Sequence, residues 1–247
     1  MTAMDVDLLA FGPHPDDLEI GMGGTICRHV DLGASVGLCD LTRGEMGSNG
    51  TPEQRVAEAD RARAVLGARW RENLGLPEGG LALTRDQIGP VVALIRRARP
   101  RVVAMPHRRD RHPDHTAAHA LLVRAVFDAG LRRFDAAGDP WRPALVCCYF
   151  INDWAPPAFV VDVTEVYGRK RKALACYESQ FQASDAAVAT RLNSPRFTQL
   201  IESRDAQFGA QAGVGFAEGF LVREPLRLPH LMAAAGLAVT ASAESAS

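Results

Sequence analysis

Short, uninterrupted apolar runs alternate along the first half of this chain with longer segments whose apolar residues recur at helical spacing. The runs lie at residues 6–11, 35–41 and 101–105. Runs of this length suit strands that are buried on both faces, as they are inside a parallel sheet. The helical segments lie at residues 18–32, 51–67, 84–99 and 115–129. Such alternation predicts an α/β fold with a mostly parallel sheet that is flanked by helices.

The pattern changes beyond Gly138. We expect two further strands at 145–151 and 158–163, and a helix that Thr164 caps. From about residue 231 the chain is rich in Ala and Ser, so a disordered tail or frayed helix is expected over 231–247. We therefore predict one domain over residues 1–230, in which the later elements form a smaller C-terminal extension.

Composition narrows the class of partner. The formal net charge is −1 and 23% of the residues are charged, so nothing draws the whole chain to nucleic acid or to an anionic membrane. No stretch approaches the ~20 apolar residues of a membrane span, and residues 1–7 carry two acids in place of the basic region of an export signal. We expect a cytoplasmic protein with a small-molecule partner. The five cysteines form no C-x-x-C pair and are interpreted as small buried apolar residues.

Two short strings of histidine and aspartate follow two of the predicted strands. One is His14-Pro15-Asp16-Asp17, and the other is His112-Pro113-Asp114-His115. Because parallel α/β sheets bind ligands at the carboxyl ends of their strands, the two strings are expected to meet at one edge. Together they offer three imidazoles and three carboxylates, which are the donor types of a hydrolytic metal site.

A hydrolytic zinc site needs about three protein ligands and an open position for water, whose pKa the ion lowers to roughly 7. His14, Asp17 and His115 would supply that set. Pro15 stiffens the turn between the first two ligands. Asp16 should point to a different side from Asp17, which leaves it free to act as general base on the water.

The second string suggests a similar division of roles. His112 lies three residues before His115 and could face the substrate. A cationic His112 would stabilise the oxyanion of a tetrahedral intermediate or protonate the leaving amine. Asp114 could hold the His112 ring and favour its charged form.

Simpler interpretations of the same residues stay open. Asp16, Asp17 and Asp114 could merely cap the helices that follow them. His119 is a rival ligand because it lies four residues after His115, although the glutamate of the helical zinc motif is absent.

Glycines and arginines near the two strings also have two interpretations. The glycines at 21, 23 and 24 lie a turn too late for a dinucleotide-binding fingerprint, and are better explained by close approach of a helix to the sheet. Arg108, Arg109 and Arg111 flank the second string, where one of them could bind an anionic group of the substrate.

At the two strings the chain resembles the PIG-L/LmbE family of zinc-dependent N-acetylglucosamine deacetylases, over about residues 7–226. It is most similar to the members that deacetylate N-acetylglucosaminyl-malate for bacillithiol. Further matching sequences are Ala10-Phe11-Gly12, Glu19-Ile20-Gly21-Met22, Cys39-Asp40-Leu41-Thr42, Ser48-Asn49-Gly50-Thr51, Asp110-Arg111, Tyr177-Glu178-Ser179-Gln180-Phe181 and Ala217-Glu218-Gly219-Phe220.

The resemblance implies a Rossmann-like fold, homo-oligomers that are often hexamers, and a bound Zn²⁺, although such a site can also take Fe²⁺ or another divalent ion. It implies the roles already given to the two strings: His14, Asp17 and His115 as ligands, Asp16 as base, and His112 with Asp114 as an electrostatic pair. It also implies four substrate-binding residues, which are Ser48, Asn49, Arg55 and Arg111. One departure is Phe197, which aligns with a tyrosine near the active site of the bacillithiol enzymes.

These observations predict a metal-dependent amidohydrolase that releases acetate from an N-acetylglucosaminide, specifically N-acetyl-α-D-glucosaminyl L-malate. A second hypothesis keeps the site but changes the substrate to another N-acetyl sugar, such as a mycothiol-type conjugate or an antibiotic precursor. A nucleotide-binding module without hydrolysis and a thiol protein built on the cysteines are the alternatives from other classes. Near-stoichiometric zinc would favour the hydrolase, and activity lost on alkylation would favour the thiol protein.

Overall fold

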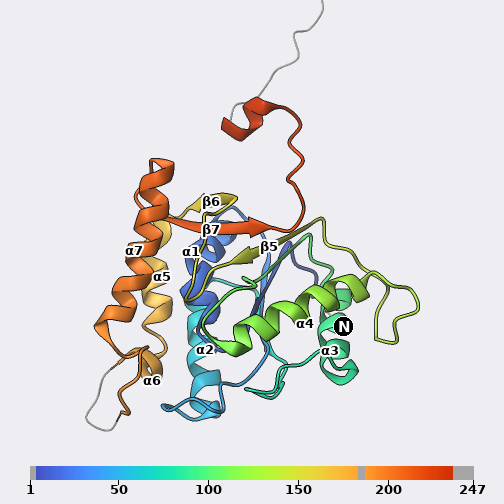
Figure 1. Cartoon of the computed structure of the whole chain (residues 1–247), viewed down its shortest axis with the longest axis horizontal. Coiled ribbons are helices and arrows are strands. Elements are labelled where there is room, and N and C mark those ends of the chain that lie inside the picture. Colours follow the sequence, from blue (N-terminus) through green and yellow to red (C-terminus); the bar gives the residue numbers. More distant parts are fainter. Residues whose placement is uncertain (1–3, 183–186, 236–247) are drawn as a thin grey trace, which may run out of the picture.

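A seven-stranded sheet runs through the structure, a computed structural model that describes residues 4–182 and 187–235 (Figure 1). The strands are β1 (Leu8–Gly12), β2 (Val36–Asp40), β3 (Trp70–Asn73), β4 (Val102–Pro106), β5 (Leu145–Tyr149), β6 (Phe159–Asp162) and β7 (Ala217–Val222). The helices are α1 (Asp17–Asp31), α2 (Pro52–Leu66), α3 (Arg85–Ala98), α4 (Pro113–Ala129), α5 (Tyr167–Leu174), α6 (Glu178–Phe181) and α7 (Pro195–Ala212), with 3₁₀ turns η1 (Thr164–Val166) and η2 (Leu231–Ala235).

The strand order is β3-β2-β1-β4-β5-β7-β6. The five strands from β3 to β5 are parallel to one another, and only β7 runs antiparallel to its neighbours β5 and β6. The predicted α/β fold with a mostly parallel sheet is therefore confirmed. The C-terminal elements do not form a separate layer, because β6 and β7 extend the same sheet.

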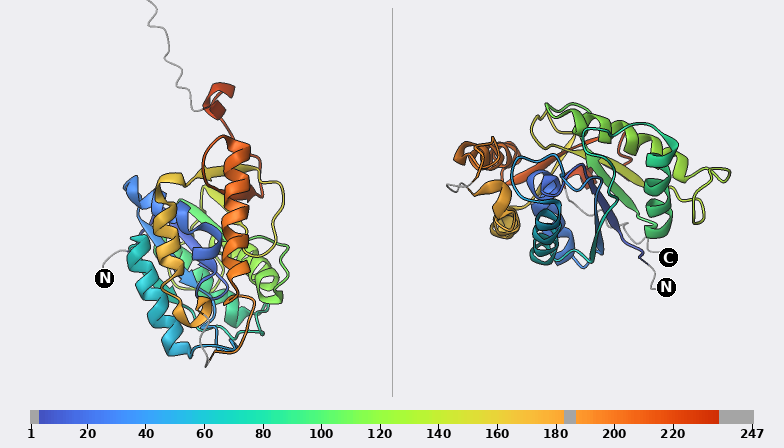
Figure 2. Two further views of the ribbon diagram at one scale, coloured as in Figure 1. Left: turned by 90° about the vertical axis from the view of Figure 1, so that its left-hand side faces the viewer. Right: turned by 90° about the horizontal axis from the view of Figure 1, so that it is seen from below.

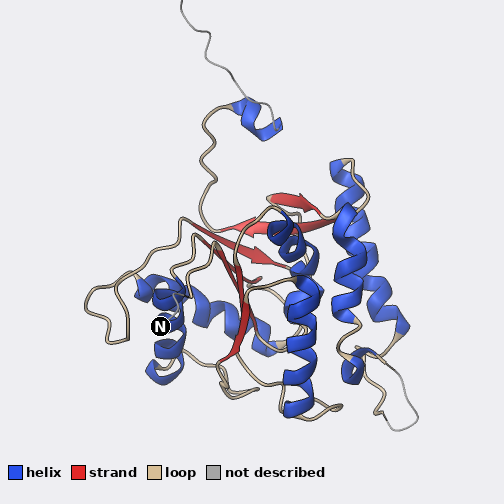
Figure 3. Ribbon diagram, turned by 180° about the vertical axis from the view of Figure 1, so that it is seen from behind, coloured by secondary structure: helices blue, strands red, loops and turns tan. Residues whose placement is uncertain are grey.

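Helices cover both faces of this sheet (Figures 2 and 3). Successive residues of β1 point to opposite faces: Leu8 and Ala10 pack with α1, α2, α5 and α7, whereas Leu9 and Phe11 pack with α3 and α4. Both faces of the central strands are buried, which explains why they read as continuous apolar runs. Cys147 and Cys148 on β5 divide between the two cores in the same way, and both are buried, as the sequence predicted.

Helix α1 is kinked at Met22, where φ is −150° and ψ is 22°. A carboxylate of β7 caps the second half of the helix, because Glu218 accepts hydrogen bonds from the amides of Gly24 (3.0 Å) and Thr25 (2.6 Å). Glu218 is itself held by the buried Lys170 Nζ at 2.5 Å. Strand β7 thus fixes the second half of α1. The first half, which begins at Asp17, continues directly from it.

Gly21 shows why a glycine is needed in α1. A Cβ at this position would lie 2.2 Å from Cδ2 of Tyr149 on β5, so any larger residue would push the helix off the sheet. This close approach supports the packing interpretation of the α1 glycines over a dinucleotide fingerprint.

Two sequence expectations for the C-terminal half were wrong or incomplete. Thr164 does not cap a helix, because its hydroxyl donates to Asp162 and accepts from the amides of Gly215 and Phe216. Helix α7 and strand β7 were not foreseen. The predicted tail lies mostly outside the described residues, of which 231–235 form η2 at the end of an arm that runs away from the body (Figure 1). Over the described ranges, no helix combines the length and the apolar character that crossing a membrane requires.

Candidate metal centre

The two histidine–aspartate strings meet because the strands before them are neighbours. Strands β1 and β4 pair in parallel, with Leu8 opposite Val102, although they are far apart in sequence. The sheet order reverses between them, since β2 and β3 lie on one side and β5 on the other. Such a switch point is where open α/β sheets bind ligands. The structure thus brings both strings to one place, as the sequence predicted.

Three of the predicted ligands form a compact donor set. Donor atoms of His14, Asp17 and His115 all lie within 4.8 Å of one another, and all three residues are buried. Asp17 Oδ2 is the common point, at 3.0 Å from His14 Nδ1 and 3.3 Å from His115 Nε2. Two imidazoles and one carboxylate around one space are a donor set that suits a zinc ion or a similar divalent ion.

Buried carboxylates give this space a negative field. Burial alone would lower the pKa of His14, but its contacts with Asp114 and Asp17 raise it to about 10. Burial likewise disfavours a charged His115, yet Asp17 and Asp110 raise its pKa to about 9. Burial would raise the pKa of Asp17, and the two histidines instead hold it well below its ordinary value. The same field that retains these protons favours a divalent cation, which would replace them.

Asp16 lies beside the ligand Asp17 in a left-handed backbone conformation and belongs to neither metal-ligating group of the described residues. Its φ is 111°, a left-handed conformation that is uncommon for a residue other than glycine and that often occurs at functional sites. The side chain makes no capping hydrogen bond to α1, so the simple capping interpretation does not describe it. Its Oδ2 instead accepts from Arg55 Nη2 at 3.1 Å. Burial raises the pKa of Asp16 to about 7, against the lowering effect of Arg55.

Asp114 has a different partner from the one expected. Its carboxylate lies 3.2 Å from His14 Nε2 and accepts from the amide of Gly79 at 2.9 Å. No hydrogen bond joins this carboxylate to the His112 ring among the described residues, although donor atoms of His14, His112 and Asp114 all lie within 4.8 Å of one another. The expected effect of Asp114 on His112 stays a prediction. Asp114 instead occupies the far nitrogen of His14, which leaves Nδ1 to face Asp17 and the donor set.

His112 serves as the N-cap of α4. Its Nδ1 accepts a hydrogen bond from the backbone amide of Asp114 at 3.2 Å. Its ring stacks on the ring of His115, with 4.7 Å between the two ring centroids. Burial lowers the pKa of His112, and the nearby His14 and His115 lower it further. The structure therefore favours a neutral ring, contrary to the expected cationic one. Since Nδ1 is an acceptor, the proton of the neutral ring is assigned to Nε2.

Asp110 is the most connected carboxylate that sequence reasoning did not single out. Its Oδ1 lies 3.0 Å from His115 Nδ1, at hydrogen-bond distance but with poor alignment, and that buried nitrogen has no other partner among the described residues. Asp110 also accepts from the amides of His112 (2.9 Å) and Asn152 (2.9 Å). The available signals were its position two residues before His112 and the family-like pair Asp110-Arg111, neither of which assigned it a role.

A loop after β3 also reaches the site without a sequence signal. Glu78 Oε1 lies 3.6 Å from His14 Nε2, and the adjacent Gly79 donates its amide to Asp114. Neither residue belongs to a recognisable motif, and only the fold brings them beside the first string.

The four predicted substrate-binding residues differ in what they can contact. Arg55 is buried and donates to the carbonyls of Gly44 (3.2 Å) and Pro15 (2.6 Å) as well as to Asp16. The amide of Asn49 is paired in both directions with the backbone of Val188. Ser48 and Arg111 are exposed. Substrate binding by the four stays a prediction; Ser48 and Arg111 are exposed, Asn49 is half-buried and Arg55 is buried.

Two other residues lie away from the donor set. His119, the rival ligand, bonds the carbonyl of Pro106 through Nδ1 at 2.9 Å and lies 4.0 Å from Cys148. It belongs to none of the metal-ligating groups among the described residues. Phe197 is buried in the core, beside Phe181.

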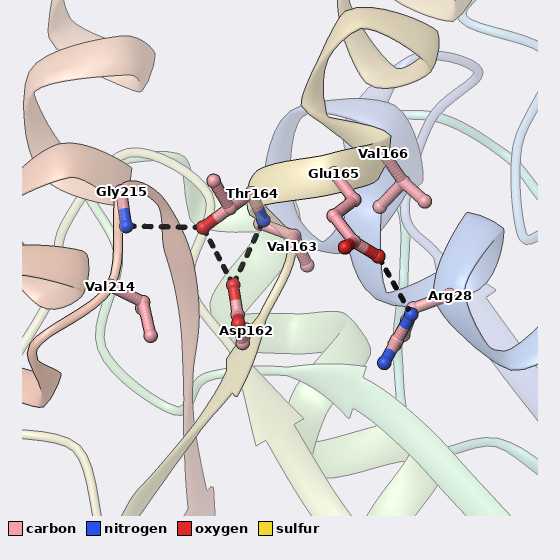
Figure 4. A pocket seen from close by; sticks show the side chains of 8 residues that line it. All are labelled: Arg28, Asp162, Val163, Thr164, Glu165, Val166, Val214 and Gly215. Atoms are coloured by element: carbon pink, nitrogen blue, oxygen red, sulfur yellow. Dashed lines mark hydrogen bonds and ion pairs between the residues drawn. The ribbon is translucent and has the colours of Figure 1, made fainter.

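A surface pocket elsewhere on the molecule contains none of the predicted site residues. It has a volume of about 310 Å³ and is lined by residues of α1, of the β6–η1 segment and of the turn before β7 (Figure 4). Its polar groups are paired with one another: Arg28 with Glu165 (3.4 Å), and Thr164 with Asp162 (2.6 Å). The pocket thus lies apart from the donor set, and its charged side chains are already paired.

Comparisons with known proteins agree with this geometry. A family model described as GlcNAc-PI de-N-acetylase (PIG-L) matches residues 9–126, which hold both strings. Diacetylchitobiose deacetylase of Thermococcus kodakarensis is 34% identical over 70% of this chain and 70% of its own length. The 1D-myo-inositol 2-acetamido-2-deoxy-alpha-D-glucopyranoside deacetylase of Rhodococcus erythropolis is 31% identical over 72% of this chain and 68% of its own. The crystal structure of a conserved protein from Thermus thermophilus superposes with a TM-score of 0.83 at 41% identity, covering 91% of this chain and 98% of that one.

Proposed function

Since this chain belongs to the PIG-L family of de-N-acetylases, we propose that it hydrolyses the acetamide of an N-acetylglucosaminide with a zinc ion held by His14, Asp17 and His115. The convergence of these three buried donors at the β1/β4 switch point is the observation that carries the proposal. The far nitrogen of each histidine faces an aspartate, Asp114 for His14 and Asp110 for His115, as is usual for histidines that bind metals.

A zinc ion in this place would acidify a water molecule and polarise the amide carbonyl of the substrate. Asp16 is the residue that takes the proton from the attacking water. Its Oδ2 is fixed by Arg55, while Oδ1 accepts no hydrogen bond from the described residues and is free to face the water. The proton then goes to the departing amine, so that acetate and the free amino sugar are the products.

His112 stabilises the oxyanion of the tetrahedral intermediate. Its Nδ1 is committed to the amide of Asp114, so the neutral ring presents an Nε2–H donor. A neutral donor of this kind needs no protonated histidine. The transfer of a proton to the amine is therefore assigned to Asp16 and not to His112.

The aglycone of the substrate is proposed to be anionic, with malate as the specific case. Arg108, Arg109 and Arg111 are exposed on the segment that leads to His112, and one of them is proposed to bind the anionic group of the substrate. Guanidinium groups suit a dicarboxylate better than a neutral sugar or inositol. The second candidate class is a neutral N-acetyl sugar conjugate, which is what the named relatives act on. A cytoplasmic location and a homo-oligomeric state stay predictions.

Acetate release by the purified, zinc-loaded protein tests the proposal. N-acetyl-α-D-glucosaminyl L-malate, the corresponding inositol conjugate and diacetylchitobiose would be compared at equal concentrations. The proposal expects release from at least one of them, the highest kcat/KM on the malate conjugate, and a preferential loss of that activity in Arg111→Ala. Equal or higher activity on the neutral conjugates would contradict the malate assignment, and no release from any of the three would contradict the deacetylase.

A further inference from the structure

A single carboxylate joins the donor set to a loop that leads toward β6. Asp110 Oδ1 lies 3.0 Å from His115 Nδ1 and accepts from the side-chain amide of Asn152 at 3.0 Å. Asp110 Oδ2 accepts from the backbone amides of Asn152 (2.9 Å) and Asp153 (3.3 Å). The next residue is Trp154, whose side chain is 41% exposed.

We propose that Asp110 is a positioning residue that orients His115 for the metal and anchors the loop carrying Trp154, so that metal affinity and loop position depend on one side chain. The inference rests on the proposed function only in taking His115 as a ligand. It assigns Asp110 no contact with the substrate.

The two ring nitrogens of His115 have different neighbours. Nε2 faces Asp17 and the donor set at 3.3 Å, and Nδ1 faces Asp110. A carboxylate at Nδ1 places the ring proton there and leaves the lone pair of Nε2 for the ion. It also raises the basicity of the ligand. Removing that carboxylate leaves a buried nitrogen with no other partner among the described residues.

The same carboxylate holds the loop between β5 and β6. Two consecutive amides, from Asn152 and Asp153, converge on one oxygen of Asp110. A carboxylate has enough lone pairs to accept all of these bonds together with the His115 contact, whereas an asparagine has a single acceptor atom. Changing Asp110 to asparagine should therefore weaken both contacts, and changing it to alanine should remove both.

Matched variants separate these roles. Asp110→Asn and Asp110→Ala would be compared with Asp153→Asn, which removes an exposed carboxylate nearby but leaves the Asp153 amide in place. His115→Ala serves as the reference for loss of a ligand. Circular dichroism confirms that each protein is folded, and the asparagine variant decides the outcome if the alanine variant does not fold.

The first readout is the dissociation constant for zinc, from competition with a chelator. Both Asp110 variants should bind zinc about 10- to 100-fold more weakly than the wild type, whereas Asp153→Asn should stay within about twofold because it touches no ligand. Unchanged affinity in Asp110→Asn would overturn the inference. A wild type that binds no zinc would instead refute the proposed function, so the two failures are distinguishable.

The second readout is acrylamide quenching of Trp154, isolated by subtracting the emission of the same protein with Trp154→Phe. Both Asp110 variants should show faster quenching of Trp154 than the wild type, because the loop loses its anchor. Equal quenching would overturn the coupling of loop and ligand, even if zinc affinity fell.

Discussion

Replacing Lys170 by methionine tests how the C-terminal strand holds helix α1. Lys170 Nζ lies 2.6 Å from Asp205 Oδ2 and 2.5 Å from Glu218 Oε1, and all three side chains are fully buried. Methionine keeps most of the side-chain volume but removes the charge. Breaking a buried ion pair by deleting one partner costs about 3–5 kcal/mol, because the remaining charge is left without compensation.

The contacts that remain place the expected cost at the lower end of this range. Asp205 keeps Arg204 at 2.9 Å and the Tyr167 hydroxyl at 3.0 Å. Glu218 keeps its two amide donors at the kink of α1. We therefore expect a loss of about 3 kcal/mol in the free energy of unfolding. For a chain of this size that corresponds to a fall of about 6–12 °C in Tm.

Urea denaturation followed by circular dichroism measures this loss. The matched control is Arg171→Met on the same helix, because Arg171 is half-exposed and pairs with Glu202 at 2.8 Å. An exposed pair contributes about 0–1 kcal/mol, so the control should barely change the midpoint. Replacing Glu218 by glutamine as well should recover part of the Lys170→Met loss, since one uncompensated charge is removed. A Lys170→Met loss no larger than that of Arg171→Met would refute the reasoning.

Three further predictions concern the site. Asp16→Asn should lower kcat by about 10²- to 10⁴-fold with zinc content unchanged; full turnover in acetate release would show that Asp16 is not the base. Gly44→Ala should lower kcat/KM, because a Cβ there would lie 1.9 Å from Arg55 Nη1, whereas Gly33→Ala, also at positive φ but with open space around it, should leave kcat/KM unchanged. His119→Ala should retain full zinc content by elemental analysis, because its Nδ1 bonds a backbone carbonyl outside the donor set; loss of the metal would restore His119 as a ligand.

The sequence could predict the parallel strands and the meeting of the two strings because both follow from local patterns and one general rule. Strands buried on both faces are uniformly apolar, and the carboxyl ends of parallel neighbours share an edge. The sequence alone could thus place His14, Asp17 and His115 together. The strand β7 could not be found in this way, since its pattern includes Glu218, a charge that only Lys170 and the kink of α1 make tolerable in the core.

The contacts around the ligands were the other part that sequence could not provide. The Asp114 carboxylate is at hydrogen-bond distance from His14, whereas the His112 ring accepts from the Asp114 amide as the cap of α4. Asp110 lies in a loop, where side-chain directions do not follow the regular repeat of a helix or strand. The family resemblance implies that Arg55 binds substrate. In the structure its guanidinium donates hydrogen bonds to Gly44, Pro15 and Asp16. Pairings of this kind depend on tertiary geometry.

Anomalous scattering from a crystal of the zinc-loaded protein, measured on both sides of the zinc edge, tests the central claim most directly. The account predicts one strong peak at about 2.0–2.2 Å from a donor atom of each of His14, Asp17 and His115. A fully occupied zinc ion bound by other residues, or an active deacetylase with no peak between these three side chains, would contradict it.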